Sequence, residues 1–221
     1  MERIIGVYKS SGPTSHDVIN RLRKITGIRK IGHAGTLDPM AEGVLVVGLG
    51  REGTKRLSTL VTKEKEYAAT IKLGENSSTD DSEGEKTKSI VRGKPSEKEV
   101  GEAVRAFLGE IQQVPPVYSA IKINGQPAHR RIRRGQSVEM QPRTVKLYQV
   151  ELREYSWPFV KVRLVTSSGF YVRAFARDLG QKLGTGGHLV GLVRTRVGNF
   201  ESRQAVRPEE YQNYFSQYAP N

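Results

Sequence analysis

Apolar and polar positions in the first fifty residues predict two strands with a helix between them. Residues 3–9 form a mostly apolar run that favours a strand, and turn-forming residues follow it. Thr14, with Asp17 three residues later, is a helix N-terminal signature, after which apolar residues repeat at helical spacing until Gly27 ends the helix. Residues 43–50 are rich in Val and bounded by Gly, which is typical of a buried strand.

The middle of the chain alternates between patterned and polar segments. Residues 65–74 carry apolar side chains at every second position, which is the period of a strand. Residues 75–89 are polar, acidic and nearly free of apolar side chains, so we expect a solvated loop there. Residues 96–109 begin with a capping box and carry one apolar stripe, which predicts an amphipathic helix. The double proline within residues 114–125 excludes a helix and favours an edge strand or a turn.

The last third of the chain predicts three strands and a helix. Residues 144–155 and 159–167 are strand candidates, residues 171–184 predict a helix that ends at Gly184, and residues 188–200 predict a further strand. Strands and helices are interspersed without a strict alternation, and several strands adjoin through short turns. The pattern therefore predicts an α+β fold with a central mixed, largely antiparallel sheet flanked by helices.

Composition narrows the class of protein. The 221 residues include 36 Lys and Arg against 23 Asp and Glu, a formal net charge of +13, which favours a nucleic-acid partner over a merely basic soluble protein. The chain has no Cys, which excludes disulfides and thiol catalysis, and its four His match no metal-ligand spacing, so we expect no metal. No apolar run is long enough for a signal peptide or a membrane span. We therefore expect a soluble protein with no membrane partner, cytoplasmic if its source is a bacterium.

Residues 30–50, KIGHAGTLDPMAEGVLVVGLG, place candidate chemistry in a loop that precedes a buried strand. Pro39 biases Asp38 away from helical dihedral angles, and two glycines permit tight bends that would bring Asp38 and His33 into one loop. A rigid loop beside a buried strand is a suitable place for a catalytic carboxylate. The alternative is an Asx-type turn, in which Asp38 only accepts hydrogen bonds from nearby amides.

Arg173 is a second candidate, because it is out of phase with the apolar stripe of the helix predicted at 171–184. It is therefore available to bind a phosphate or to pair with a carboxylate. The alternative is that Arg173 and Arg177, one helical turn apart, belong to a solvated face.

A dense basic run lies in the segment HRRIRRG, residues 129–135. Its four arginines are Arg130, Arg131, Arg133 and Arg134. Such density in a strongly basic chain favours phosphate contact over a solvated charge run, although phosphate contacts by themselves carry no base code.

Four ordered motifs resemble those of the TruB-type tRNA pseudouridine synthases. The segment GPTSHDVINRLRKITGIRKIGHAGTLDPMAEGVLVVGLG is similar to the N-terminal signature of that family, with GHAGTLDP as the catalytic motif. GTKRLSTLVTKEKEYAATIKLG resembles the second block, VPPVYSAIKINGQ the third, and SSGFYVRAFARDLGQKLGTGGHLVGLVRTRVGNF the fourth. The resemblance extends to about Phe200 and implies a pseudouridine-synthase-like fold.

The resemblance implies an isomerase that converts uridine 55 in the T loop of tRNA to pseudouridine, by base flipping and with no cofactor. By position, Asp38 would be the nucleophile. Tyr67 would stack on the target base near the proton that leaves C5, and Arg173 would pair with Asp38. A covalent handle is chemically reasonable, because the base is detached and rejoined through carbon. The residues leave open whether the carboxylate attacks the sugar or C6 of the base.

The resemblance also implies a set of substrate-binding residues. His33 would displace or hold the extruded nucleotide, and Tyr171 would line the pocket. Lys55 and Asp81 match positions that support the pocket. The four arginines of the basic run fall in the insert that clamps the T loop, at about 124–143, where the family commonly has an aromatic and acidic sequence. We therefore expect stronger phosphate contact at this insert.

The resemblance further implies a domain organisation and a partner. A catalytic domain would span residues 1–206, and a short tail, residues 207–221, would stand in place of the usual C-terminal RNA-binding module. We expect a monomer that binds the T stem-loop of tRNA. The alternative is a non-catalytic RNA-binding protein or tRNA chaperone, which would need the basic surface but not Asp38, Tyr67 and Arg173 together.

Overall fold

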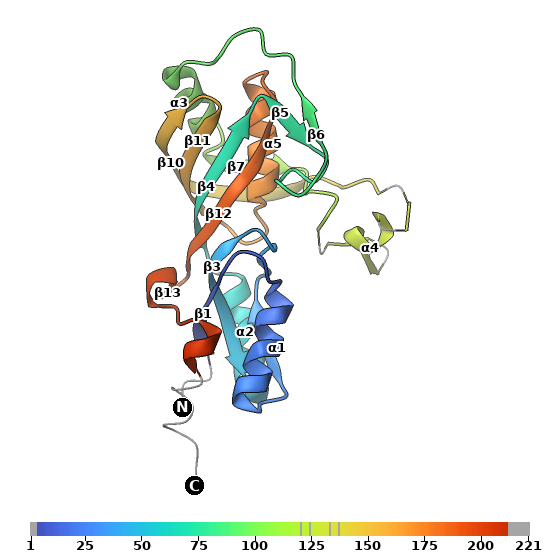
Figure 1. Cartoon of the computed structure of the whole chain (residues 1–221), viewed down its shortest axis with the longest axis vertical. Helices are drawn as coiled ribbons and strands as arrows, with labels where there is room; N and C mark the ends of the chain where they lie inside the picture. Colours follow the sequence, from blue (N-terminus) through green and yellow to red (C-terminus); the bar gives the residue numbers. More distant parts are fainter. Residues whose placement is uncertain (1–3, 120, 124, 133, 137, 212–221) are drawn as a thin grey trace. The chain divides into compact units, whose positions relative to one another are not determined.

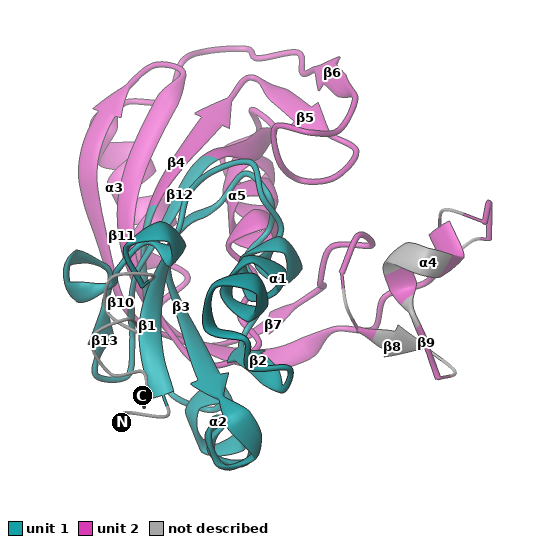
Figure 2. Cartoon of the chain, turned by 60° about the horizontal axis from the view of Figure 1, so that its bottom comes forward, with its two compact units in different colours: residues 1–68, 191–221 teal, residues 69–190 magenta. Residues whose placement is uncertain are grey.

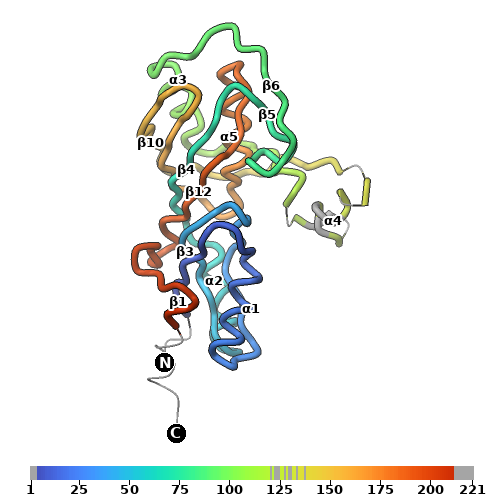
Figure 3. Tube along the Cα trace, viewed as in Figure 1, coloured from blue at the N-terminus to red at the C-terminus, as the bar shows by residue number. Residues whose placement is uncertain are grey.

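The computed structural model describes residues 4–119, 121–123, 125–132, 134–136 and 138–211. The chain divides into two compact units, which are coloured separately in Figure 2. Unit 1 comprises residues 1–68 and 191–221, and unit 2 comprises residues 69–190. Unit 2 is thus a continuous segment between the two segments of unit 1. The chain passes from one unit to the other within residues 65–73 and again within residues 187–197, and its path can be followed in Figure 3.

Unit 1 is built around the buried strand predicted at residues 43–50. Its elements in chain order are β1 (Ile4–Lys9), α1 (Ser15–Thr26), β2 (Ile31–Ala34), β3 (Glu42–Leu49), α2 (Gly50–Val61), the start of β4 (Lys65–Leu73), the end of β12 (Gly187–Val197), β13 (Phe200–Glu201) and the 3-10 turns η1 (Ser202–Gln204) and η2 (Pro208–Glu210) (Figure 1). β3 pairs antiparallel with β1 and with β2, and parallel with β12. The parallel pairing brings the backbone of Arg194 so close to Gly43 that a Cβ at Gly43 would lie 2.2 Å from the Arg194 carbonyl oxygen.

Helix α1 has the ends that its sequence predicts. Thr14 and Asp17 form a reciprocal capping box, and Gly27 ends the helix with a left-handed φ of 69°. The apolar stripe of α1, which includes Val18 and Leu22, packs in one cluster with side chains of β1 and β3, such as Leu45. This packing places the N-terminus of α1 beside the residues that precede β3, which matters for the site described below.

Unit 2 contains a second group of strands, the helices α3 and α5, and the short helix α4. Its elements are the rest of β4, β5 (Glu75–Ser77), β6 (Lys86–Lys88), α3 (Glu97–Arg105), β7 (Gly109–Gln113), β8 (Lys122–Ile123), β9 (Gln126–Pro127), α4 (Ala128–Ile132), β10 (Arg143–Ser156), β11 (Phe159–Thr166), α5 (Val172–Lys182) and the start of β12. The strand order is β12-β4-β11-β10-β7, and the β10 pairs with β7 and β11 are antiparallel. Within unit 2, Figure 2 shows α4 set apart from this sheet.

The predicted fold class is confirmed: the strands form a mixed, mostly antiparallel sheet flanked by helices. One element was predicted wrongly, because residues 75–89 are not a solvated loop. They contain the antiparallel pair β5 and β6, and Asp81 between these strands is only 3% exposed. The helix predicted at 96–109 is also shorter, since it ends at Arg105 and leaves Leu108 exposed. Among the described residues, no helix is both long and apolar enough to span a membrane.

Candidate active site

The loop that carries Asp38 is held by a buried lysine. We call residues 35–41 the aspartate loop. Lys9, at the end of β1, is 0% exposed, and its Nζ donates to the carbonyl oxygens of Pro39 at 2.9 Å and Ala41 at 2.6 Å. The Pro39 oxygen also accepts from the amide of Gly12 at 2.9 Å. A buried ammonium is tolerated only when its protons have acceptors, and here two of the acceptors belong to the aspartate loop.

A buried arginine holds the other end of the same loop. Arg194 on β12 is 1% exposed. Its Nη2 donates to the Gly35 oxygen at 3.0 Å, its Nη1 to the Thr36 oxygen at 3.5 Å, and its Nε to the Val44 oxygen at 2.9 Å. The planar guanidinium thus bridges the aspartate loop and β3.

The N-terminus of α1 provides a third attachment of the aspartate loop. The Ser15 hydroxyl donates to the Leu37 oxygen at 3.0 Å and accepts from the Leu37 amide at 2.9 Å. Within the loop, the Ala41 amide donates to the main-chain oxygen of Asp38 at 3.0 Å, which closes a turn around Pro39. The half-buried Asp38 is therefore presented by a backbone that is bonded on both sides of it.

Tyr67, also in unit 1, is electrostatically coupled to Asp38. It is buried on β4, where the charge of Arg194 acts on its hydroxyl. Burial raises the pKa of Tyr67, and the charge of Asp38 raises it further, while Arg194 opposes the shift. Burial lowers the pKa of Arg194, while Tyr67 and Asp38 raise it. Asp38, Tyr67 and Arg194 therefore form one electrostatically coupled group.

Two further basic side chains of unit 1 lie near this group. His33 on β2 is half-buried, and burial lowers its pKa, with Arg194 adding to the effect, so that the neutral ring is favoured at pH 7. The Nδ1 atom of His33 is buried, and none of the described residues bonds to it. The Nζ of Lys65 donates to the oxygens of Val61 at 2.8 Å and Lys63 at 2.7 Å. Burial, together with the charge of Arg194, lowers the pKa of Lys65 to about 8.

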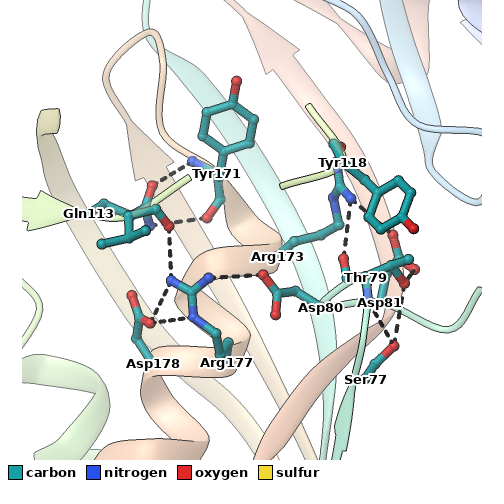
Figure 4. A network of polar contacts seen from close by, with 11 residues as sticks. Ser77, Thr79, Asp80, Asp81, Gln113, Tyr118, Tyr171, Arg173, Arg177 and Asp178 are labelled. Carbon is teal, nitrogen blue, oxygen red and sulfur yellow. Dashed lines mark hydrogen bonds and ion pairs between the residues drawn. The ribbon is translucent and has the colours of Figure 1, made fainter. Parts of the chain in front are cut away.

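Arg173 lies in unit 2, in the first turn of α5, and it is buried at 6% exposure (Figure 4). Its Nη1 contacts Asp81 Oδ2 at 3.3 Å and donates to the Thr79 oxygen at 3.2 Å, and its Nη2 donates to the Tyr118 oxygen at 2.9 Å. The interpretation of Arg173 as part of a solvated face is therefore wrong, and its pairing with a carboxylate, here Asp81, is confirmed. The predicted contact of Arg173 with Asp38 joins residues of different units and stays a prediction.

Asp81 and Arg177 extend the polar network of unit 2. Asp81 accepts from the Thr79 hydroxyl and from the amide of Glu83 at 3.0 Å. Arg177, one turn after Arg173, pairs with Asp80 at 2.9 Å and with Asp178 at 2.8 Å. Burial raises the pKa of Asp80 although Arg177 lowers it. These ion pairs explain how so polar a segment as 75–89 is ordered, because the arginines of α5 provide partners for its carboxylates.

The remaining predicted residues are placed as follows. The main chain of Tyr171 is bonded by the Gln113 side chain, whose Oε1 accepts from the Tyr171 amide at 2.8 Å while its Nε2 donates to the Tyr171 oxygen at 3.1 Å (Figure 4). Lys55 is exposed on α2. In the basic run, Arg130 belongs to α4, Arg131 bonds Gln136 at 3.1 Å, Arg134 is exposed, and Arg133 lies outside the described residues.

Sequence reasoning missed Lys9 and Arg194. The signal that could have indicated them is a charged residue within or at the end of an apolar strand run, since such a residue must be satisfied where it is buried. No group of three or more His, Asp and Glu suited to a metal ion occurs in the part of the chain that the structure describes.

Two family models match this chain. The family model described as TruB family pseudouridylate synthase (N terminal domain) matches residues 23–172, and the tRNA pseudouridylate synthase B C-terminal domain matches residues 173–219. The second match begins before the predicted domain boundary at residue 206 and includes most of the predicted tail.

Curated relatives match over most of the chain. The tRNA pseudouridine synthase B of Thermobifida fusca is 46% identical over 94% of this chain and 73% of its own length. That of Nocardia farcinica is 52% identical over 89% of this chain and 65% of its own length. Among solved structures, a Cbf5-Nop10-Gar1 complex aligns with a TM-score of 0.76 and 30% identity, covering 97% of this chain and 55% of the matched one. Because the N-terminal family model covers more than half of the sequence and includes the aspartate loop, the chain belongs to the TruB family of pseudouridylate synthases.

Proposed function

We propose that this protein converts uridine 55 in the T loop of tRNA to pseudouridine. The observation that carries the proposal is the aspartate loop, which is held by Lys9, Ser15 and Arg194 and presents Asp38 in a chain of the TruB family. The curated relatives are named tRNA pseudouridine synthase B, and the chain spans 65 to 73% of the length of the two described above. The net charge of +13 suits a tRNA substrate. As a tRNA-modifying enzyme the protein would act in the cytoplasm.

Asp38 acts as the nucleophile in this proposal. The reaction breaks the N-glycosidic bond of uridine, turns the base and rejoins it through C5, so a covalent link keeps the fragments in the site. A carboxylate can form that link with the sugar or with C6 of the base. The bonds of Lys9 and Ser15 to the aspartate loop support this role, because a nucleophile that is held in place loses little entropy on reaction.

Tyr67 and His33 receive the flipped base. Everting a nucleotide costs a few kcal/mol, and stacking on an aromatic ring returns about 1–3 kcal/mol. Tyr67, which is electrostatically coupled to Asp38, would supply the ring and lie near the proton that leaves C5. His33 would occupy or hold the space from which the nucleotide is displaced, and the neutral ring that its environment favours suits contact with a base.

Arg173 pairs with Asp38 in the catalytic state. An adjacent guanidinium typically lowers the pKa of an aspartic acid by about 1–3 units, which keeps the nucleophile ionised. Asp81 supports Arg173 from within unit 2, as its contact at 3.3 Å suggests. Tyr171 lines the pocket, Lys55 supports it, and the basic run Arg130, Arg131, Arg133 and Arg134 grips the phosphates of the T stem-loop. The enzyme acts as a monomer and uses no cofactor.

The experiment that tests the proposal compares an unmodified tRNA transcript with the same transcript carrying cytidine at position 55. Pseudouridine is located by carbodiimide adduct mapping after incubation with the full chain. We expect product at position 55 of the first transcript only. Asp38→Asn should lower the rate by about 10³-fold or more, because the covalent step loses its nucleophile. Glu210→Gln, which makes the same charge change at an exposed residue of η2, should leave the rate unchanged.

Three outcomes would contradict the proposal. Tight tRNA binding without product would favour the alternative, a non-catalytic RNA-binding protein or tRNA chaperone. Full activity of Asp38→Asn would remove the nucleophile from the account. Product at another position, with position 55 untouched, would overturn the assignment of the substrate nucleotide.

A further inference from the structure

Gln113 is a buried polar side chain at the end of a strand in unit 2. It is the last residue of β7 and only 1% exposed. Its backbone is held in register by β10, where it lies opposite Arg143. Burying an amide is costly unless its polar atoms are hydrogen-bonded, so the partners of this side chain indicate what it holds.

Both polar atoms of the Gln113 side chain bind the main chain of one residue, Tyr171. The Oε1 atom accepts from the Tyr171 amide at 2.8 Å, and the Nε2 atom donates to the Tyr171 oxygen at 3.1 Å (Figure 4). Opposite residues of two antiparallel strands exchange the same two bonds. The side chain of Gln113 thus takes the place of a strand neighbour and fixes the peptide groups on both sides of Tyr171.

Tyr171 is the position at which α5 begins. It is the N-cap of that helix, and its own side chain makes no capping bond. Its oxygen also accepts from the Phe175 amide at 3.1 Å, which starts the hydrogen bonding of the helix. Because the first amides of a helix have no partner within it, the N-cap is held from outside, here by Gln113. Arg173 follows two residues later, so the direction in which it projects depends on where α5 begins.

The residues that follow Gln113 also contact α5, but in a different way. The Val114 oxygen accepts from Nη2 of Arg177 at 2.9 Å, and the Tyr118 oxygen accepts from Nη2 of Arg173 at 2.9 Å. These two bonds hold arginine side chains. The contact made by Gln113 is the one of the three that acts on the main chain of α5.

We propose that Gln113 is a positioning residue that fixes the start of α5, so that the guanidinium of Arg173 is placed for its pairing with Asp38. This inference rests on the proposed function, in which that pairing keeps the nucleophile ionised. Gln113 contacts neither the base nor the nucleophile in this account and acts through the main chain of Tyr171.

The test variant is Gln113→Met, which removes the donor and the acceptor while an unbranched side chain of similar length fills the space. The matched control is Gln112→Met. It makes the same change at the preceding residue, whose exposed side chain donates to the Thr144 hydroxyl at 2.8 Å. The single-turnover rate constant on the tRNA transcript, the Kd for that tRNA from filter binding and the Tm are measured for each variant.

The rate constant and the affinity should respond differently. We expect Gln113→Met to lower the rate constant at least about tenfold at temperatures well below Tm, since a misplacement of about 1 Å can cost 10²-fold. The Kd should change less than about threefold, because phosphate contacts dominate the affinity for nucleic acid. Gln112→Met should change neither. An unchanged rate constant in Gln113→Met, or a loss confined to Kd, would overturn the inference.

A double-mutant cycle with Arg173→Lys distinguishes positioning from a purely structural role. In the Arg173→Lys background Gln113→Met should cost no more than about threefold, because the guanidinium that it positions is absent. The same factor in both backgrounds, following the Tm, would refute the positioning role. If wild type converts no uridine, the proposed function fails first and this inference falls with it. An active wild type with an unaffected Gln113→Met refutes this inference alone.

A measurement on wild type serves if Gln113→Met does not fold. The hydrogen exchange of the Tyr171 amide is followed by NMR and compared with that of the Phe175 amide, which is bonded within the helix. We expect the two to exchange at rates within about tenfold of each other, because Gln113 supplies the acceptor that an N-cap amide otherwise lacks. Exchange of the Tyr171 amide at the rate of an unstructured peptide would overturn the inference.

Discussion

Lys9→Met removes one attachment of the aspartate loop while keeping the length of the buried side chain. Lys9 is 0% exposed, and its ammonium donates to the oxygens of Ser10, Pro39 and Ala41 at 3.1, 2.9 and 2.6 Å. Methionine fills a similar volume without a donor. The substitution therefore leaves the packing of β1 in place and withdraws hydrogen bonds from the loop that presents Asp38.

The loss of stability depends on which hydrogen bonds each main-chain oxygen still accepts in the variant. The Pro39 oxygen still accepts from the Gly12 amide, whereas the bond from Lys9 to the Ala41 oxygen is removed. An unsatisfied buried acceptor costs about 1–3 kcal/mol, and removing the desolvation cost of a buried ammonium offsets part of what its hydrogen bonds contribute. We expect the free energy of unfolding to fall by about 2 kcal/mol, which corresponds to a Tm lower by about 4–8 °C in a chain of this size.

The catalytic effect should exceed what this loss of stability implies. At temperatures well below Tm the variant remains folded, yet the aspartate loop has lost the hydrogen bonds that Lys9 donates to Pro39 and Ala41. We expect the single-turnover rate on tRNA to fall by about 10- to 100-fold, because the reacting groups must be placed to within a fraction of an ångström. Calorimetry and the mapping assay measure the two quantities on the same samples.

Lys98→Met is the matched control, since Lys98 is exposed on α3. It should leave both Tm and rate unchanged. If Lys9→Met behaves like this control, the attachment of the loop by Lys9 has no energetic weight and the reasoning fails. A lower Tm with an unchanged rate would show that Lys9 serves stability alone.

Three further predictions concern other charged groups. The pKa of Lys65 is lowered to about 8, so the free energy of unfolding rises with pH between about 8 and the pKa of an unfolded-state lysine. The Tm of wild type, relative to that of Lys65→Met, should therefore increase as the pH is raised from about 7 to about 9.5. A Tm difference that does not change with pH would contradict this. Arg173→Lys should lower the catalytic rate by more than conserved charge suggests, because Lys lacks the planar two-pronged contact, and single-turnover kinetics will reveal full activity if that is wrong. Replacing the basic run by Ala should make the plot of log binding constant against log salt concentration less steep. The slope should change by about 0.9 for each duplex phosphate that the variant no longer binds. An unchanged slope in filter binding would show that the basic run does not bind phosphates of the tRNA. That last variant changes Arg130, Arg131, Arg133 and Arg134.

Local signals in the sequence were enough to predict most of the fold. The capping boxes at the start of α1 and α3 and the left-handed Gly27 are settled by residues a few positions apart. The alternation of β4 is equally local, since the buried positions of that strand follow the apolar side chains. Such elements are predictable because the groups that stabilise them are neighbours in the chain.

The paired carboxylates were beyond local reasoning. Asp81 and Arg173 are separated by 92 residues, and nothing in the segment 75–89 indicates that α5 will supply partners for its acids. Local reasoning therefore predicts a solvated loop for this segment, and it leaves open whether Arg173 binds a phosphate, pairs with a carboxylate or belongs to a solvated face. Both questions turn on the same long-range ion pair, which only the tertiary structure settles.

The cations of unit 1 bear on the chemistry as well as on the packing. The charge of Asp38 raises the pKa of Arg194. An interaction free energy is shared by both partners, so the same coupling must stabilise the ionised form of Asp38. The hydrogen bonds of Arg194 described above go to main-chain oxygens, whereas its influence on Asp38 is coulombic. A positive charge that acts through its field stabilises a carboxylate without occupying the lone pairs that must attack carbon. Arg194 therefore adds a second positive charge to the proposed pairing of Asp38 with Arg173, and both charges favour the ionised nucleophile.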